Sequence, residues 1–370
     1  MSCQLYVFGS NGEGQLGIAT ADIINTPTLV LDSLPLENLK SIQSGDNHTL
    51  LQISNTDIYG AGSNRKAQIA PHQDTSNPVR LEHFQKLANG YHFVAATCES
   101  SAYISSDLRP STIVWTTGLG QWGELGRGDG CTSTAGSPSL TEALKKTLFG
   151  TAVDFAAGVW HYIVILDDGS TYGWGKARLG QLGDNLEGKV TEPTKIEGLP
   201  FKPNKVVCGK DFTYLVGDPV TGEHVVLGKD KFGIVSGKPD DVKGWKDIGA
   251  TWHAIFVLFE NGTLIAWGKE NMWQLIPPNL PLIERLAVGS DHVLALTLEG
   301  KLISWGWGKH GNCGDLSKLS EPLGNDMLSG IWNEISIPGK IEMIAAGYCT
   351  SFVVTRQGAK EGVKLHQRRI

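Results

Sequence analysis

The sequence predicts an all-β fold, a seven-bladed β-propeller whose last blade is completed by both ends of the chain. Three observations predict it: an imperfect motif recurs along the chain, its two halves occur equally often, and each end of the chain carries one unpaired half. The composition agrees, because 46 Gly and 11 Trp at ordinary hydrophobicity suit many short strands and tight turns.

Residues 155–183 form the fullest copy of the motif. Residues 162–166 are an apolar run of strand length, and Asp168 and Gly169 supply the turn of a hairpin. Residues 170–175 are then expected to return as the antiparallel partner, followed by a Gly-rich turn ending at Gly183. A polar side chain that leads into a buried strand is usually hydrogen-bonded, so we expect His161 to be a core residue rather than a metal ligand or base.

Each half of the motif carries a marker glycine. The first halves are marked by Gly45, Gly90, Gly158, Gly209, Gly249, Gly289 and Gly347. The second halves are marked by Gly9, Gly60, Gly118, Gly175, Gly228, Gly268 and Gly306. The chain opens with a second half and ends with a first half, which complete each other in a closed ring, whereas a solenoid would have capping units. We therefore expect residues 5–9 to pair with residues 344–355.

Loops and insertions between the copies are the expected place for function. The second blade is interpreted as having a polar hairpin extension at residues 100–111, and residues 141–149 have the composition of a short surface helix. The propeller is expected to span residues 1–355, followed by a basic tail at residues 356–370.

Charge, cysteines and apolar runs limit the partners. The net charge of −6 argues against direct nucleic-acid binding. The six cysteines form no C-x-x-C pair, which predicts neither a zinc site nor a disulfide framework. Without a secretory leader or an apolar run approaching about 18 residues, we expect no membrane partner and a cytoplasmic protein, with the nucleus as a second location.

Catalytic motifs are not found in the sequence. The glycine-rich segment 9–14 lacks the G-K-[ST] ending of a phosphate-binding loop and is interpreted as a repeat turn. No H-E-x-x-H or G-x-S-x-G motif occurs, so the sequence predicts a binding module without catalytic residues, cofactor or metal. An enzyme would bind a small molecule in a central pocket, whereas a binding module would be inert without its partner.

The repeat pattern G-x-x-H, apolar run, D-G-x-x-x-W-G and G-Q-L-G resembles the regulator-of-chromosome-condensation family of seven-bladed propellers. Residues 158–183 carry that pattern most fully, and Gly45 with His48 and Gly289 with His292 repeat its first half. The resemblance spans about residues 5–355.

Three stretches, residues 1–17, 206–212 and 305–314, resemble a narrower fungal group, the α-tubulin-suppressor and killer-toxin-insensitivity type. This resemblance implies a heterodimer with the small CSL-type zinc-ribbon protein of diphthamide synthesis. Through that partner it implies support for diphthamide formation on elongation factor two and for Elongator-dependent modification of tRNA wobble uridines. The alternative is a guanine-nucleotide exchange factor for a GTPase of the nuclear-transport type, although the founding exchange factor's basic N-terminal arm is missing here.

The partner site is expected where a copy departs from the repeat, because a scaffold can use such positions for recognition. Trp307 is the leading candidate, since a second aromatic side chain so close to Trp305 is awkward to bury in one blade. The alternative is that these side chains only fill space between blades. The full set of candidates is Trp307, Lys309, His310, Cys313, Trp273, Trp252, His253, Lys210 and Asp211.

Overall fold

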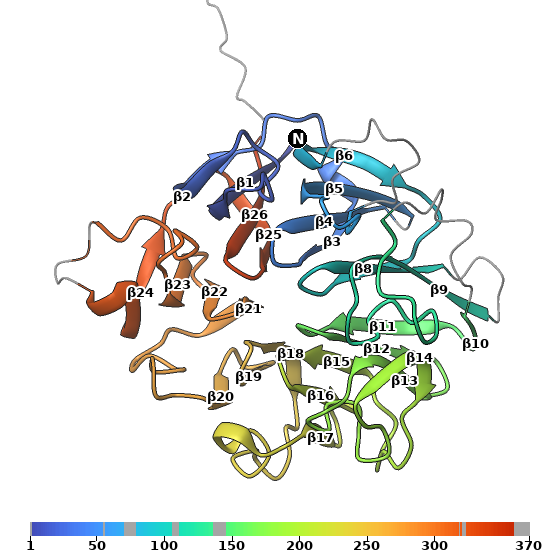
Figure 1. Ribbon diagram of the computed structural model, residues 1–370. Coiled ribbons are helices and arrows are strands. Elements are labelled where there is room, and N and C mark those ends of the chain that lie inside the picture. The colour runs from blue at the N-terminus through green and yellow to red at the C-terminus, as the bar shows by residue number, and fades with distance from the viewer. Residues whose placement is uncertain are drawn as a thin grey trace, which may run out of the picture.

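Seven antiparallel sheets stand around a central axis in the computed structural model (Figure 1), which confirms the predicted all-β propeller. The structure describes residues 2–54, 56–69, 79–105, 111–135, 146–317, 319 and 323–358. Most of the expected basic tail lies outside the described residues. No helix among the described residues is long and apolar enough to cross a membrane.

We number the blades along the chain and give their strands from the axis outward. Blade 1 contains β3 (Leu39–Ser44), β4 (His48–Ile53), β5 (Asp57–Ser63) and β6 (Arg80–Ala88). Blade 2 contains β7 (Phe93–Ala96), β8 (Ser100–Ser105), β9 (Ser111–Gly118) and β10 (Lys146–Phe149). Blade 3 contains β11 (Ala152–Ala157), β12 (His161–Leu166), β13 (Thr171–Lys176) and β14 (Lys189–Lys195).

Blades 4 and 5 have three strands each, whereas blades 6 and 7 have four. Blade 4 contains β15 (Lys205–Cys208), β16 (Phe212–Val216) and β17 (His224–Gly228), and blade 5 contains β18 (Trp245–Ala250), β19 (Ala254–Phe259) and β20 (Leu264–Gly268). Blade 6 contains β21 (Ile283–Val288), β22 (His292–Thr297), β23 (Leu302–Trp307) and β24 (Met327–Ile335). Blade 7 contains β25 (Lys340–Ala346), β26 (Thr350–Arg356), β1 (Cys3–Asn11) and β2 (Ala21–Leu29). Short 3-10 turns are η1 (Leu36–Asn38), η3 (Lys231–Gly233) and η4 (Gly324–Asp326).

Blade 7 closes the ring, as the unpaired halves predict. Strand β1 pairs with β26 from Cys3 opposite Arg356 to Gly9 opposite Thr350. The two strands therefore lie side by side although they come from opposite ends of the chain (Figure 1). Seven residue pairs lie opposite each other along β1 and β26, so neither strand is left with an unpaired edge where the two ends of the ring meet.

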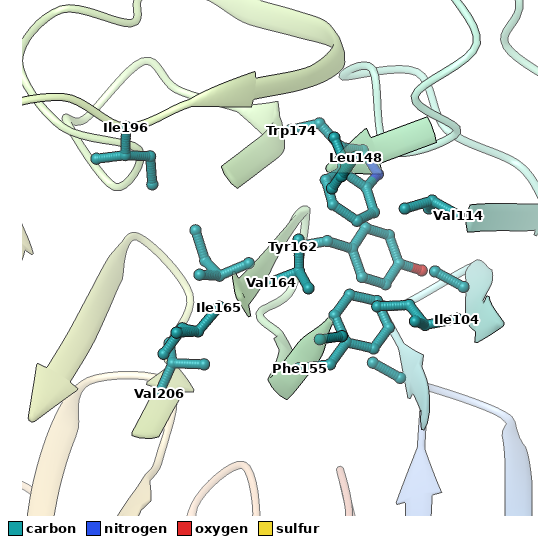
Figure 2. Close-up of a cluster of buried hydrophobic side chains, with 14 of the residues drawn as sticks. Ile104, Val114, Leu148, Phe155, Tyr162, Val164, Ile165, Trp174, Ile196 and Val206 are labelled. Atoms are coloured by element: carbon teal, nitrogen blue, oxygen red, sulfur yellow. The ribbon is translucent and has the colours of Figure 1, made fainter. Parts of the chain in front are cut away.

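The core lies between neighbouring blades, and the second strand of a blade is its most buried element. Every side chain of β12 is buried, which explains its apolar, β-branched sequence. The rings of Phe155, Tyr162 and Trp174 stack outward through blade 3 with centroids 5.2 to 6.0 Å apart (Figure 2). Residues of blade 2, including Ile104 and Val114, pack against this stack from the neighbouring blade.

Residues 100–105 are the second strand of blade 2, so the predicted polar hairpin extension is wrong in its described part. Strand β8 is fully buried although its sequence is rich in serine. Its hydroxyl groups are paired between blades: Ser100 Oγ lies 2.8 Å from Tyr162 Oη, and Ser101 Oγ lies 2.9 Å from His48 Nε2. Burial of these serines is therefore compatible with the rule that buried polar groups are hydrogen-bonded.

The predicted helix at residues 141–149 is also wrong where it can be checked. Residues 146–149 form β10, which pairs with β9 from Lys146 opposite Val114 to Phe149 opposite Ser111. Residues 141–145 lie outside the described residues. Pairing with an available strand edge outweighs the weak helix propensity of so short a segment.

Three of the fourteen marker glycines were placed on the wrong residue. In each blade, the backbone N–H of one loop residue donates to the C=O of the first residue of the second strand, which lies three positions later. In blades 2 and 5 this donor is Thr97 and Thr251, rather than Gly90 and Gly249. Gly62, rather than Gly60, is the end-of-strand glycine of blade 1, because it pairs with His48. Threonine fits where the residue three positions later is small, Ser100 or Ala254, whereas glycine is needed where a His or Phe ring covers it.

Candidate interaction face

The loops before the second strand and the turns after the third strand lie on one face of the ring, which we call the G-x-x-H face. The register requires it, because His161 pairs with Gly175 and His292 pairs with Gly306 at the same end of their blades. The loops are also bonded from blade to blade. The Lys210 N–H donates to Trp252 O (2.9 Å), and the Trp252 N–H donates to Ser290 O (2.9 Å).

The G-x-x-H histidines form a repeated hydrogen-bond relay between blades. Nε2 of His48, His161 and His292 lies 2.9 Å from the Ser101, Thr213 and Ser351 hydroxyl of the next blade, respectively. Each hydroxyl in turn donates to a backbone carbonyl, that of Gln68, Gln181 and Asn312, respectively. Because the hydroxyl uses its proton there, each histidine is assigned as the Nε2–H tautomer.

Burial lowers the pKa of His48, His161 and His292 to about 3 each. Their Nδ1 atoms are buried and have no hydrogen-bond partner among the described residues, so a proton there would be unsatisfied. These histidines join blades as neutral side chains, in agreement with the structural role expected for His161.

All nine candidate residues belong to loops or turns of the G-x-x-H face. Trp307 ends β23, and its N–H donates to Asp291 O (2.7 Å) in the loop of the same blade. The ring of His310 lies edge-on to the Trp307 ring with centroids 5.0 Å apart. Trp307 and His310 are partly exposed, and Lys309 is exposed. By contrast, Trp305 is fully buried and its Nε1–H donates to Leu275 O (2.8 Å), so only one of the two tryptophans fills the blade.

Two candidates are core residues. Trp273 is 4% exposed and stacks on Phe256 with centroids 6.3 Å apart. Cys313 is completely buried, in the same hydrophobic cluster. Their side chains therefore pack the interior of blades 5 and 6 and are not presented to a partner in this conformation.

The four remaining candidates gather on blades 4 and 5. The Lys210 ammonium lies 5.4 Å from the centroid of the Trp252 ring. Asp211 is paired with Lys176 of blade 3, with Oδ1 and Nζ 3.1 Å apart. His253 is partly buried, and its pKa is lowered to about 4, mainly by burial and then by nearby lysines. The candidates of blades 4 and 5 lie on the same face as those of blade 6, and the Trp252 N–H bond to Ser290 O links their loops.

A cavity of about 340 Å³ lies on the ring axis. The inner strands line it, with side chains such as Ile42, Val207 and Leu286. The rings of Trp252 and Tyr348 also line this cavity and meet with centroids 5.6 Å apart. Among the described residues, no three His, Cys, Asp or Glu side chains come together in a way that could hold a metal ion.

Two aromatic side chains of this face were not predicted as site residues. Trp122, in the turn of blade 2, has Lys176, Arg178 and Lys189 within 5.8 Å of its ring centroid. Phe232, in the turn of blade 4, is 40% exposed. Both replace residues of other types in equivalent repeat turns, so the same departure rule that selected Trp307 would have selected them.

The repeat is also recognised by family comparison. The model of the regulator of chromosome condensation (RCC1) repeat matches residues 4–52 and 168–216, and a second model of the same repeat matches residues 283–312. An RCC1 repeat-containing protein of Schizosaccharomyces pombe is 28% identical over 375 residues, covering 96% of this chain and all of that protein. The secretion-regulating guanine nucleotide exchange factor of Mus musculus is 24% identical, covering 84% of this chain and 75% of the mouse protein.

Solved structures share the fold. Human WBSCR16 superposes with a TM-score of 0.76 at 18% identity, over 96% of this chain and all of that chain. Prp20p of Saccharomyces cerevisiae, studied for its binding to Gsp1p and histones, superposes with a TM-score of 0.76 at 17% identity, over 97% of this chain and 92% of that chain. The chain is therefore a seven-bladed propeller that carries three matches to the RCC1 repeat and is similar to RCC1 repeat-containing proteins.

Proposed function

We propose that this protein is a non-catalytic regulatory subunit that binds another protein through its G-x-x-H face. The observation that carries the proposal is the Trp307–His310 pair, which is partly exposed beside Lys309 although Trp305 already fills the blade. Aromatic anchors with polar neighbours are typical of the residues that dominate interface energies. We take this pair as the centre of the site, with Lys210, Trp252 and His253 as a second contact group.

The proposed partner is the small CSL-type zinc-ribbon protein of diphthamide synthesis, in a heterodimer. Through it the protein would support diphthamide formation on elongation factor two and Elongator-dependent wobble-uridine modification, in the cytoplasm and in the nucleus as a second location. The support is the resemblance of residues 1–17, 206–212 and 305–314 to the fungal group. Each of these stretches contributes a loop or turn to the G-x-x-H face, as expected if the resemblance marks one shared surface.

Deleting the gene is expected to lower both wobble-uridine modification and diphthamide, measured by mass spectrometry of tRNA and of elongation factor two. Unchanged levels of both modifications would contradict the proposed role while leaving the fold intact.

Binding of the purified zinc-ribbon protein tests the site. Replacing Trp307 by Ala should weaken it by roughly 30- to 1,000-fold, the loss typical of a hot-spot aromatic. Trp332→Ala is the matched control, because Trp332 is a partly buried tryptophan on the outer strand of the same blade. Wild-type affinity for Trp307→Ala would place the site elsewhere, and a collapsed melting temperature would identify Trp307 as a packing residue.

A guanine-nucleotide exchange factor is the second candidate, supported by the similarity to the mouse secretion-regulating exchange factor. Exchange needs an interaction face that displaces nucleotide and no catalytic pocket, so the same face would serve it. Accelerated release of a fluorescent guanine nucleotide from a nuclear-transport GTPase would support this candidate over the zinc-ribbon role, and an unchanged release rate would exclude that GTPase.

A further inference from the structure

A second pocket lies off the axis on the G-x-x-H face, where blades 3, 4 and 5 meet. Its cavity volume is about 340 Å³. Phe212 and Ile234 of blade 4 are nearly inaccessible and form its floor, and Leu179 contributes from the turn of blade 3. Phe232 and His253 complete the lining, with ring centroids 5.3 Å apart. The pocket is thus an apolar depression of a size that suits a large side chain.

Phe232 is held in a strained conformation. Its φ is 62° and its ψ is 25°, the left-handed region that costs a bulky residue energy. Phe232 is nevertheless 40% exposed, so burial offsets this strain only in part. Strained backbone conformations cluster at functional sites such as ligand clamps.

Lysines surround the pocket without paired carboxylates. The ammonium groups of Lys231 and Lys269 each lie 5.3 Å from the centroid of the Phe232 ring. Lys229 is exposed in the lining. Within the described ranges none of these three lysines forms an ion pair with a carboxylate.

The two carboxylates of the pocket are already engaged. Asp211 is paired with Lys176, and Asp230 Oδ1 accepts the backbone N–H groups of Val235 and Ser236 at 2.9 and 3.0 Å. Lys269, Lys231 and Lys210 add to burial in lowering the pKa of His253, as expected where the local potential is positive. The pocket therefore combines an apolar floor with positive charge in a chain whose net charge is −6.

We propose that this pocket binds an apolar side chain from an acidic segment of a partner protein, with Lys229, Lys231 and Lys269 contacting the flanking carboxylates. Two other occupants fit less well. The chain's own residues 359–370 carry Lys360, Lys364, Arg368 and Arg369 against Glu361, so they match the pocket in charge sign. A nucleic acid would place phosphates beside Asp211 and Asp230 and leave the apolar floor uncovered.

A synthetic peptide tests the pocket without relying on the zinc-ribbon partner. The probe is a fluorescein-labelled decapeptide with one phenylalanine among glutamates, titrated with the full-length protein by fluorescence anisotropy. The comparison probes replace its phenylalanine by serine or its glutamates by lysines, and a single-stranded RNA of similar length is the third. We expect binding of the acidic phenylalanine peptide, with affinity lowered roughly tenfold or more in each comparison probe.

Two variants locate the contact. Phe232→Gly should weaken the peptide roughly tenfold while keeping or raising the melting temperature, because glycine relieves the strain at φ 62°. The double variant Lys231→Glu with Lys269→Glu should weaken it at least tenfold. Lys40→Glu is the matched control, an exposed lysine at the axis-side start of β3, and should bind the peptide like wild type.

The proposal would be overturned by equal binding of all peptides, by preferential binding of the RNA, or by variants that bind the acidic peptide like wild type. A lower melting temperature of Phe232→Gly would also count against it, because the ring would then be required for folding rather than held for a partner.

Discussion

Glu124 stands where the turns of blades 1, 3, 5 and 7 carry glutamine, and replacing it by glutamine should stabilise the protein in a pH-dependent way. In blade 3, Gln181 Oε1 accepts the Leu179 N–H at 2.9 Å, and in blade 2 Glu124 Oε2 accepts the Trp122 N–H at 2.7 Å. The amide of Glu124→Gln can therefore keep this bond. Glu124 is 1% exposed, and burial raises the pKa of its carboxyl from 4.5 to about 7.

The raised pKa fixes the sign of the effect. The folded state holds the Glu124 proton more tightly than the unfolded chain does. The stability that this bound proton gives the folded state is therefore full below pH 4.5 and is lost as the pH rises through about 7. Each pH unit between the two pKa values corresponds to about 1.4 kcal/mol, so ionised Glu124 costs the folded state about 3 kcal/mol at alkaline pH. With an unfolding entropy typical of a chain this long, this is a change of about 4 °C in melting temperature.

Thermal unfolding of Glu124→Gln and wild type at about pH 8.5 and about pH 5 measures this difference. The variant should melt about 4 °C higher at the alkaline pH and nearly like wild type at the acidic pH. The reciprocal variant Gln181→Glu should be destabilised, and more so at the alkaline pH, because Gln181 is equally buried. A stability change of Glu124→Gln that is the same at both pH values, or a lower melting temperature at alkaline pH, would refute the assigned cause.

Three further predictions concern the repeat and ring closure. Burial lowers the pKa of each relay histidine from 6.5 to about 3, so the free energy of unfolding should fall as the pH drops below 6.5. The expected loss is about 2 kcal/mol per histidine at about pH 5. Urea titrations that give the same free energy of unfolding at neutral and mildly acidic pH would contradict this prediction. Gly175→Ala should lower the free energy of unfolding by roughly 3 kcal/mol or more, because φ is 106° and the new Cβ would overlap Trp160 O. Gly300→Ala, at φ 81° with open space around it, should lower it by only about 1 kcal/mol. Equal melting temperatures of the two variants would speak against the overlap. A chain cut at residue 339 lacks β25 and β26 and should lose cooperative unfolding in calorimetry, whereas one cut at residue 358 should retain it; a cooperative transition at the wild-type temperature in the shorter chain would rule out ring closure as a source of stability.

The blade number could be predicted from the sequence because it depends on counting halves, and an error of a few residues does not change the count. The register inside a blade could not be predicted where another residue replaces the marker glycine. Thr97 and Thr251 take the marker position in the two blades where Ser100 and Ala254, rather than a His or Phe ring, stand three residues later. That compensation is visible only when the two positions are seen in contact.

Polar strands were the second source of error. Apolar periodicity identifies a buried strand only when its buried positions carry apolar residues. Strand β8 carries serines instead, because Ser101 is needed for hydrogen bonds between blades. The candidate site was also only partly predicted, because the sequence alone does not show which unusual residues are buried. Departure from the repeat correctly indicates that a residue is unusual, but it does not distinguish Trp307, which is partly exposed, from Trp273, which is needed in the core.

Hydrogen exchange of the full chain, alone and with the purified zinc-ribbon protein, tests the central claim most directly. The proposal predicts slower amide exchange in the turn at residues 307–314 and in the loops at residues 210–212 and 252–253 of the G-x-x-H face. The hairpins of the opposite face, such as residues 167–170 and 298–301, should exchange at the same rate with and without the partner. Protection confined to those hairpins, or none at saturating partner, would contradict the assignment of the G-x-x-H face as the binding surface.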